Sequence, residues 1–281
     1  MKNNNKAEST INFTRKALTF LSKHTSLSEP EAVKQFIAQM DRKNGYKHNL
    51  CIAYNHYCNF YQIIWKMPLY RNEEREIVPP KKDKILMLIA EAHKTTSMKL
   101  QLSMESGLRP VELCRLIVKD FHPDERIITP LTAKNGNPRS LKISQQLTTR
   151  IQEHIIRRNL KQTDKIFCGN SDDYGKHYRA MRNKLAEKLN DPSIRTIRLY
   201  DLRHYFCTKK LYELQNPYTV MHLMGHKKLT TTQKYIHLLN LADDEWECQG
   251  AETKQQAIQL IEAGFQYVTT IEGIQLFKKR K

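Results

Sequence analysis

The sequence predicts a mainly α-helical protein with a small β-hairpin or sheet, which is an α+β fold built in two parts. Apolar side chains recur at helical spacing in several segments. The segments 126–131 and 139–143 bracket Asn135-Gly136, a dipeptide that favours a tight turn between paired strands. The Pro79-Pro80 pair lies in a polar stretch that interrupts the helices. The expected parts are a helical domain at 1–75, a linker at 76–82 and a larger domain at 83–281.

Two helices are predicted in the first domain. The sequence Ser28-Glu29-Pro30-Glu31 has the pattern of a capping box and marks the start of a helix that ends near Met40. A second helix is expected at 49–65. Four of its residues recur on one face, namely Cys51, Tyr54, Cys58 and Tyr61. We interpret this face as part of the core and not as a surface on which bases stack.

The larger domain is expected to contain a series of helices followed by two short strands. The predicted helices lie at 85–92, 97–105, 145–159, 175–189, 199–212, 217–224, 231–239 and 254–262. The two strands, at 266–270 and 274–278, flank the turn signal Glu272-Gly273.

A strong positive charge indicates a polyanionic partner. The chain has 47 Lys and Arg against 29 Asp and Glu, a net charge of +18, and its pI is near 9.6. Residues 141–240 alone hold 19 basic and 8 acidic side chains. Nucleic acid is the first expected partner and an acidic membrane surface the second. Because the planar guanidinium suits phosphate, the DNA contacts are expected from arginines in this block. They are Arg179, Arg182, Arg195 and Arg198.

Composition also argues against several classes of protein. The longest wholly apolar run, 85–90, is too short to cross a bilayer, and the polar start at 1–9 has no signal-peptide core. We therefore expect a cytoplasmic protein without a membrane segment. The six cysteines show no CxxC pair and no zinc-type spacing to histidine. Most of these thiols are expected to be reduced and buried, with no metal site.

Arg109 lies at a predicted junction between two helices. Gly107 suits the end of one helix, and Pro110 suits the first turn of the next. Glu112 follows three residues after Arg109, within reach of its guanidinium for a charge-assisted pair. Taken alone, this arrangement fits a structural Arg–Glu pair as well as it fits a functional one.

Five further residues complete a set suited to phosphoryl transfer. Tyr200 and Arg203 share a helix face, His226 ends a predicted helix, Tyr235 follows it, and Lys134 precedes the hairpin tip. Each residue alone is more often structural or simply solvated. Together, two guanidinium groups and an imidazole can hold phosphate oxygens, a phenol can attack, and a lysine can protonate the leaving oxygen. This chemistry requires no metal and no cofactor.

These residues occur in ordered motifs that resemble the tyrosine recombinase (phage integrase) family. The motifs are Gly107-Leu108-Arg109 with Glu112-Leu113, then Lys134, Asp201-Leu202-Arg203-His204, Leu223-Met224-Gly225-His226, and Tyr235 with His237. The similarity covers about 83–240, and the stretch 261–281 resembles archaeal members. The resemblance implies a tyrosine-recombinase catalytic domain preceded by a helical core-binding domain that clamps DNA.

The same resemblance implies a site-specific DNA recombinase or integrase. Arg109 and Arg203, with His226 as the third donor, would clamp the scissile phosphate. Lys134 would protonate the 5′ oxygen, and Tyr235 would attack to form a 3′-phosphotyrosyl link. A homo-tetramer would hold two DNA duplexes and exchange their strands without a cofactor.

Tyr200 departs from the family pattern, because it stands where the HxxR box usually has histidine. A phenol with a pKa near 10 can donate a hydrogen bond to phosphate but is a poor base at neutral pH. Either Tyr200 only helps to bind phosphate, or water or His204 takes the proton of the nucleophile. Glu112 would not touch the phosphate but would support the residues that bind it. Tyr235 is the expected nucleophile, because the position of Tyr200 beside Arg203 matches the binding box.

Two other functions are compatible with the motifs. A type IB topoisomerase uses the same chemistry to relax supercoils as a monomer, although the separate N-terminal domain and the modest length favour a recombinase. A non-catalytic DNA-binding protein with this fold would have no need of Arg109, Arg203 and Tyr235, all of which are present.

Overall fold

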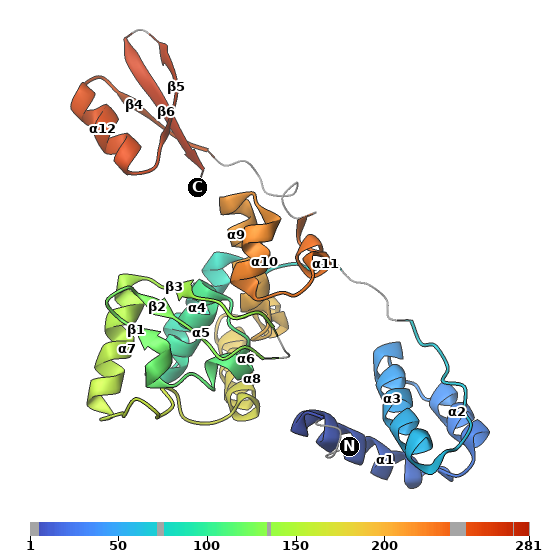
Figure 1. Cartoon of the computed structure of the whole chain (residues 1–281). Helices are drawn as coiled ribbons and strands as arrows, with labels where there is room; N and C mark the ends of the chain where they lie inside the picture. The colour runs from blue at the N-terminus through green and yellow to red at the C-terminus, as the bar shows by residue number, and fades with distance from the viewer. Residues whose placement is uncertain (1–5, 72–75, 134–135, 237–245, 272, 281) are drawn as a thin grey trace. The chain divides into compact units, whose positions relative to one another are not determined.

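The structure is a computed structural model of the whole chain, and it describes residues 6–71, 76–133, 136–236, 246–271 and 273–280 (Figure 1). Contacts divide the chain into two compact units, Met1–Glu76 and Ile77–Lys281. Helices dominate both units, and the strands form two small antiparallel sheets. The predicted α+β class is confirmed. Among the described residues, no helix has the length and apolar character needed to cross a membrane.

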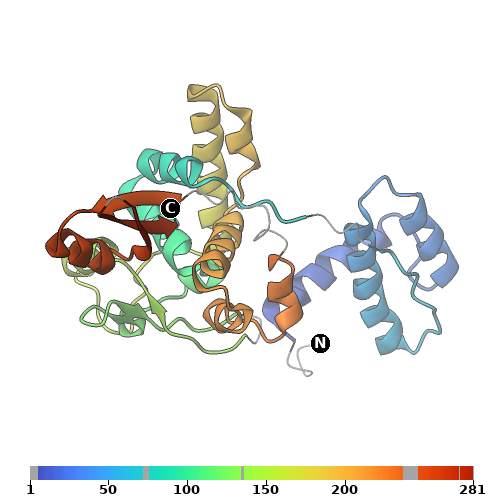
Figure 2. The ribbon, with the colours of Figure 1, turned by 90° about the horizontal axis from the view of Figure 1, so that it is seen from above.

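In its described residues, the first unit has three helices around one apolar core. They are α1 (Glu8–Ser22), α2 (Pro30–Gln39) and α3 (Asn44–Tyr61), and α3 packs against the other two (Figures 1 and 2). Helix α1 was not predicted. Cys51, Tyr54 and Cys58 are fully buried as expected, but Tyr61 is 59% exposed. Tyr61 is the last residue of α3, because the left-handed Gln62 ends the helix there.

The start of α2 differs from the predicted capping box. Glu29 occupies the N-cap position, with no hydrogen bond from its side chain to the helix, and Pro30 is the first helical residue. The Ser28 hydroxyl instead pairs with the Ser26 hydroxyl at 2.8 Å. The helix is therefore started by proline, whose fixed φ already suits the first turn.

The second unit begins with a helical core. Its helices are α4 (Lys82–Glu91), α5 (Lys94–Ser106), α6 (Pro110–Leu113), η2 (Val118–Asp120), α7 (Gln145–Arg157), α8 (Ser171–Lys188), η3 (Pro192–Thr196), α9 (Asp201–Leu214), α10 (Pro217–Met224) and α11 (Leu229–Gln233). Helix α5 is central, because it contacts α4, α6, α7 and α9 and buries residues on all sides, among them Met98, Leu100 and Leu102. The motifs singled out in the sequence lie at the end of α5, at the start of α9, and directly after α10 and α11.

Several helix boundaries differ from the predicted ones for local reasons. Helix α8 starts at Ser171 instead of 175, because the Asn170 side chain accepts hydrogen bonds from two backbone N–H groups of the first turn. Helix α9 starts at Asp201, with Tyr200 as its N-cap residue. Helix α11 ends at Gln233, whereas we expected a helix at 231–239, of which residues 237–239 lie outside the described part.

A three-stranded sheet precedes α7. Strands β1 (Phe121–His122), β2 (Ile127–Ile128) and β3 (Leu141–Lys142) are antiparallel in the order β1-β2-β3. The predicted pairing of β2 with β3 is confirmed, with Ile128 opposite Leu141. The paired segments are only two residues long and are separated by residues 129–140. The turn predicted at Asn135-Gly136 involves residues 134–135, which lie outside the described part. Strand β1 was not predicted.

The chain ends in a small module with its own core. Strands β4 (Trp246–Ala251), β5 (Gln266–Ile271) and β6 (Ile274–Arg280) form an antiparallel sheet in the order β4-β6-β5. Helix α12 (Lys254–Glu262) packs on one face of this sheet (Figures 1 and 2). The core residues are Ala251, Ala257, Phe265 and Phe277. The predicted helix and the last two strands are confirmed, whereas β4 was missed because its partner β6 is distant in sequence.

Candidate active site

Arg109 is held at a tight junction between α5 and α6. Gly107 ends α5 in the left-handed conformation with φ of 62°, and Pro110 is the first residue of α6. A side chain at position 107 would collide with the Phe206 ring, so glycine is required there for two reasons. Arg109 itself is the N-cap residue of α6. The direction of its side chain is thus set by the backbone, as the sequence predicted.

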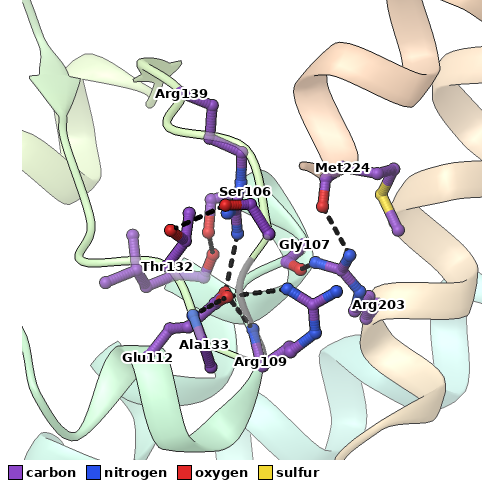
Figure 3. Close-up of polar contacts among 11 residues, drawn as sticks. Ser106, Gly107, Arg109, Glu112, Thr132, Ala133, Arg139, Arg203 and Met224 are labelled. Atoms are coloured by element: carbon purple, nitrogen blue, oxygen red, sulfur yellow. Dashed lines mark hydrogen bonds and ion pairs between the residues drawn. The ribbon is translucent and has the colours of Figure 1, made fainter. Parts of the chain in front are cut away.

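Glu112 is the anchor of this region, with a fully buried carboxylate (Figure 3). Oε1 accepts from Arg109 Nη1 at 2.7 Å and from the Ala133 N–H at 3.1 Å. Oε2 accepts from the Arg109 N–H at 3.0 Å and from Arg139 Nη2 at 2.6 Å. Burial alone would raise the pKa of Glu112, but Arg139 and the backbone N–H groups outweigh it and lower the pKa to about 2. The carboxylate therefore stays ionised.

Glu112 also positions the connection between β2 and β3. Its bond to Ala133 fixes the residue that directly precedes Lys134, and Lys134 itself lies outside the described residues. The same connection is tied to the segment that follows α10, because Asn137 Nδ2 donates to the His226 carbonyl at 3.2 Å. Arg139, which sequence reasoning did not single out, completes the anchor. In the sequence, a single arginine at the start of a predicted strand gives no indication that its side chain is buried.

Arg203 lies on α9 and is almost completely buried (Figure 3). Nη1 donates to the Gly107 carbonyl at 2.6 Å and Nη2 to the Met224 carbonyl at 2.5 Å, so the guanidinium joins the ends of α5 and α10. Nε has no hydrogen-bond partner in the described part of the chain. Burial, followed by the nearby charge of Arg109, lowers the pKa of Arg203. Two cations are thus held close together, which favours binding of an anion.

His226 follows Gly225, which ends α10 with φ of 61°, as predicted. Nδ1 of His226 is 2.9 Å from the Thr232 hydroxyl, and the residue is buried. Burial, with the charges of Arg203, Arg109 and Arg139, lowers the pKa of His226 to about 3. The imidazole is therefore neutral at physiological pH. When the Thr232 hydroxyl donates to Nδ1, the ring proton lies on Nε2 and can be donated to a ligand.

Tyr235 follows α11 and is only 4% exposed. Its hydroxyl is 2.7 Å from Nδ1 of His204 on α9. Burial raises the pKa of Tyr235, while the charges of Arg203 and Arg109 act in the opposite direction. Tyr200 is 42% exposed, and its ring meets the His204 ring edge-on with 5.1 Å between centroids. The two candidate tyrosines therefore flank one histidine.

Residues 80–241 match the model of the phage integrase family. The chain belongs to the phage integrase family. In this family member, the predicted residues come from four separate segments and gather around one site: Arg109 between α5 and α6, Tyr200 and Arg203 at the start of α9, His226 after α10, and Tyr235 after α11.

Relatives of this phage integrase family chain include two proteins named tyrosine recombinase XerA. The one from Saccharolobus solfataricus is 28% identical over 190 residues, which cover 67% of this chain and 62% of the relative. The one from Pyrococcus furiosus is 29% identical over 145 residues, which cover 47% and 46%. The chain thus spans less than two thirds of the length of these relatives. Both organisms are archaea, in agreement with the predicted archaeal type.

Solved structures share the fold. A structure of the Tn1549 transposon integrase, in complex with transposon right end DNA, matches with a TM-score of 0.64 and 16% identity. The match covers 92% of this chain and 94% of the integrase.

The four arginines expected to contact DNA lie on or near α8 and η3. Arg179 is exposed on α8, whereas Arg182 donates to the Ile197 carbonyl at 2.8 Å. Arg195 forms an exposed ion pair with Glu187 at 2.8 Å, and Arg198 pairs with Asp201 at 2.9 Å. Three of the four thus have internal partners, and a phosphate would have to compete with these partners or share the guanidinium with them.

In the described ranges, no group of three or more His, Cys, Asp or Glu could hold a metal ion.

Replacement of Glu112 by glutamine is expected to destabilise the protein by about 3 kcal/mol at pH 7. The pKa of Glu112 is lowered from 4.5 to about 2, so its contribution is complete above pH 4.5 and is lost as the pH falls towards 2. Equilibrium urea unfolding should show a difference between wild type and Glu112→Gln that shrinks from pH 5 to pH 3. The control Glu187→Gln, in an exposed ion pair, should cost less than about 1 kcal/mol. A difference independent of pH would contradict the assignment.

Proposed function

We propose that this chain is a site-specific DNA recombinase or integrase that cleaves and rejoins DNA through a 3′-phosphotyrosyl link at Tyr235. The observation that carries the proposal is the convergence of Arg109, Arg203 and His226 beside the buried hydroxyl of Tyr235. Relatives named tyrosine recombinase, and an integrase of the same fold solved in complex with DNA, support it.

The anchored groups suit a phosphate in the transition state. Glu112 takes only one guanidinium nitrogen of Arg109, so the others can donate to a phosphate oxygen. Arg203 Nε and His226 Nε2 would supply two further donors. Donors fixed in advance stabilise the charge that develops on the non-bridging oxygens without a cost of reorganisation. Tyr200 would add a phenolic donor at the exposed edge of the site.

The proposed reaction is a transesterification. The Tyr235 oxygen attacks phosphorus, the bond from phosphorus to the 5′ oxygen breaks, and Lys134 protonates the leaving oxygen. The phosphotyrosyl bond conserves the energy of the broken phosphodiester, so a second 5′ hydroxyl can reverse the step. Strand exchange between two duplexes would require four copies of the chain. We therefore propose a homo-tetramer on double-stranded DNA, acting in the cytoplasm where that DNA is found.

A covalent adduct is the direct test of this function. The protein would be incubated in EDTA with a supercoiled plasmid that carries its own gene and the flanking DNA. We expect a protein–DNA species that survives SDS and disappears after digestion with proteinase K. Mapping of the cleaved strand gives the target site. Relaxation of the plasmid without recombinant products would indicate a topoisomerase, and binding without any adduct would indicate a non-catalytic DNA-binding protein.

Binding to DNA is expected to weaken steeply as salt increases. Residues 141–240 carry 19 basic and 8 acidic side chains, and each phosphate contact adds about −0.9 to the slope of log K against log salt. We expect a slope of about −5 or steeper in fluorescence anisotropy titrations. Arg179→Ala, which removes an exposed arginine on α8, should reduce the slope by about one. A slope near zero would refute the role of this basic block.

A further inference from the structure

His204 connects the nucleophile to an acidic residue. Its Nδ1 is 2.7 Å from the Tyr235 hydroxyl, and its Nε2 is 4.0 Å from Asp201 Oδ1. The ring is mostly buried between Tyr200 and Tyr235, with centroids 5.1 and 5.5 Å away. The order tyrosine, imidazole, carboxylate is that of a nucleophile, a base and a group that orients the base.

The role of a base requires one direction of this hydrogen bond. When the Tyr235 hydroxyl donates to Nδ1, that nitrogen carries no proton and the ring proton lies on Nε2, the nitrogen nearer to Asp201. Asp201 is held in place because its carboxylate accepts from the Arg198 N–H at 2.8 Å and from Arg198 Nη2 at 2.9 Å. The carboxylate is thus available on the side of the ring where positive charge would appear.

The surroundings keep the imidazole neutral before the reaction. The charged and titratable groups that face it are Asp201, Arg198, Arg203, Tyr200 and Tyr235. Burial lowers the pKa of His204, Asp201 raises it, and Arg198 and Arg203 lower it further, so that the net direction is downward. A neutral imidazole beside a phenol can accept its proton at physiological pH.

We propose that His204 is the general base for Tyr235, and that Asp201 is a positioning residue which orients His204 and stabilises its protonated form. The proposal rests on the proposed function, and it assigns the proton acceptor that the tyrosine at position 200 cannot supply. As the Tyr235 oxygen bonds to phosphorus, its proton moves to His204 Nδ1. The bond from phosphorus to the 5′ oxygen breaks, and that oxygen takes a proton from Lys134.

Resealing reverses each transfer. The attacking 5′ hydroxyl gives its proton to Lys134, its oxygen bonds to phosphorus, and the phosphotyrosyl bond breaks. The proton on His204 Nδ1 then returns to the Tyr235 oxygen. No proton is left over and no oxidant, reductant or metal enters the cycle.

The first test compares His204→Asn with His204→Ala and with the control His222→Asn, which changes an exposed histidine on α10. Asparagine can still accept a hydrogen bond near the position of Nδ1 but cannot take a proton. On the plasmid described above, we expect both His204 variants to form the adduct about 100-fold or more slowly than wild type. The wild-type rate should fall only below the ordinary histidine pKa of 6.5, and both variants should lose this dependence. A His204→Asn variant with the wild-type rate and pH profile would overturn the proposal.

A second test distinguishes the role of His204, the proposed base, from that of Lys134, the proposed acid. Once the cleavage site is mapped, the 5′-bridging oxygen of the scissile phosphate is replaced by sulfur, which leaves without a proton. The sulfur substrate should restore cleavage by Lys134→Ala and should not restore cleavage by His204→Asn. Restoration of His204→Asn would mean that His204 acts on the leaving group, and the proposal would be wrong.

A third measurement needs no DNA, so it tests the contact even if wild type forms no adduct and the proposed function fails. In the ¹⁵N spectrum of the full chain at pH 7.5, Nδ1 of His204 is expected to be unprotonated and to shift in Tyr235→Phe. Loss of the phenolic donor should also raise the pKa of His204, because that donor favours the neutral ring. A protonated Nδ1 at pH 7.5 would refute the proposed base.

Discussion

Replacement of Tyr235 by phenylalanine is expected to abolish the covalent adduct while leaving the Kd for DNA within about threefold of wild type. The change removes one oxygen atom, the proposed nucleophile, from a ring that is 4% exposed and packed in the core. The rest of the phosphate-binding groups are anchored by contacts that do not involve this hydroxyl. SDS gels and anisotropy titrations on the same plasmid-derived DNA measure the two quantities.

The matched control is Tyr200→Phe, because both tyrosines contact the His204 ring. Tyr200 is at the exposed edge of the site and its hydroxyl is proposed to bind phosphate, so this variant should retain the adduct at a lower rate. An adduct that persists in Tyr235→Phe and disappears in Tyr200→Phe would identify Tyr200 as the nucleophile.

Replacement of Arg109 by lysine is expected to slow adduct formation by about 10²–10³-fold, although the positive charge is kept. Arginine can donate to Glu112 with one nitrogen and to a phosphate with the others, whereas a lysine ammonium lacks this planar arrangement. Binding of DNA and the free energy of unfolding should change much less than the rate. Single-turnover cleavage assays measure the effect.

Arg115→Lys provides the comparison, because Arg115 is exposed one residue beyond the C-cap of α6 and lies outside the anchored cluster. It should cleave at the wild-type rate. If Arg109→Lys also cleaves at that rate, Arg109 is a structural partner of Glu112 and not a phosphate ligand, which is the alternative that the sequence alone left open.

Local rules explain which parts of the site were predictable. Glycine at 107 and proline at 110 end one helix and start another through their own backbone preferences, so the junction that holds Arg109 could be located without a structure. The same reasoning located His226 after Gly225. The helix at Lys254–Glu262 and the strand after Gly273 also follow from short-range signals.

Contacts between distant segments were not predictable. Arg139 and Ala133 bind Glu112 across 27 and 21 residues, and His204 meets Tyr235 across 31 residues. Strand β4 depends on pairing with β6 at the other end of its module. These partners cannot be inferred from Arg139 or from residues 246–251 alone. Arg139 is buried because it binds Glu112, and residues 246–251 form a strand because they pair with β6.

Three features follow from the amino-acid sequence alone: the α+β class, the helix ends that present Arg109 and His226, and the order of motifs that resembles the phage integrase family. These features depend on backbone preferences within a few residues and on residue identity. Two sets of contacts depend on the tertiary fold: Glu112 binds two arginines and the residue before Lys134, and His204 contacts Tyr235. Burial and proximity create those roles, because a carboxylate or an imidazole changes its protonation and its partners only when folding brings distant charges and hydroxyls within hydrogen-bonding distance.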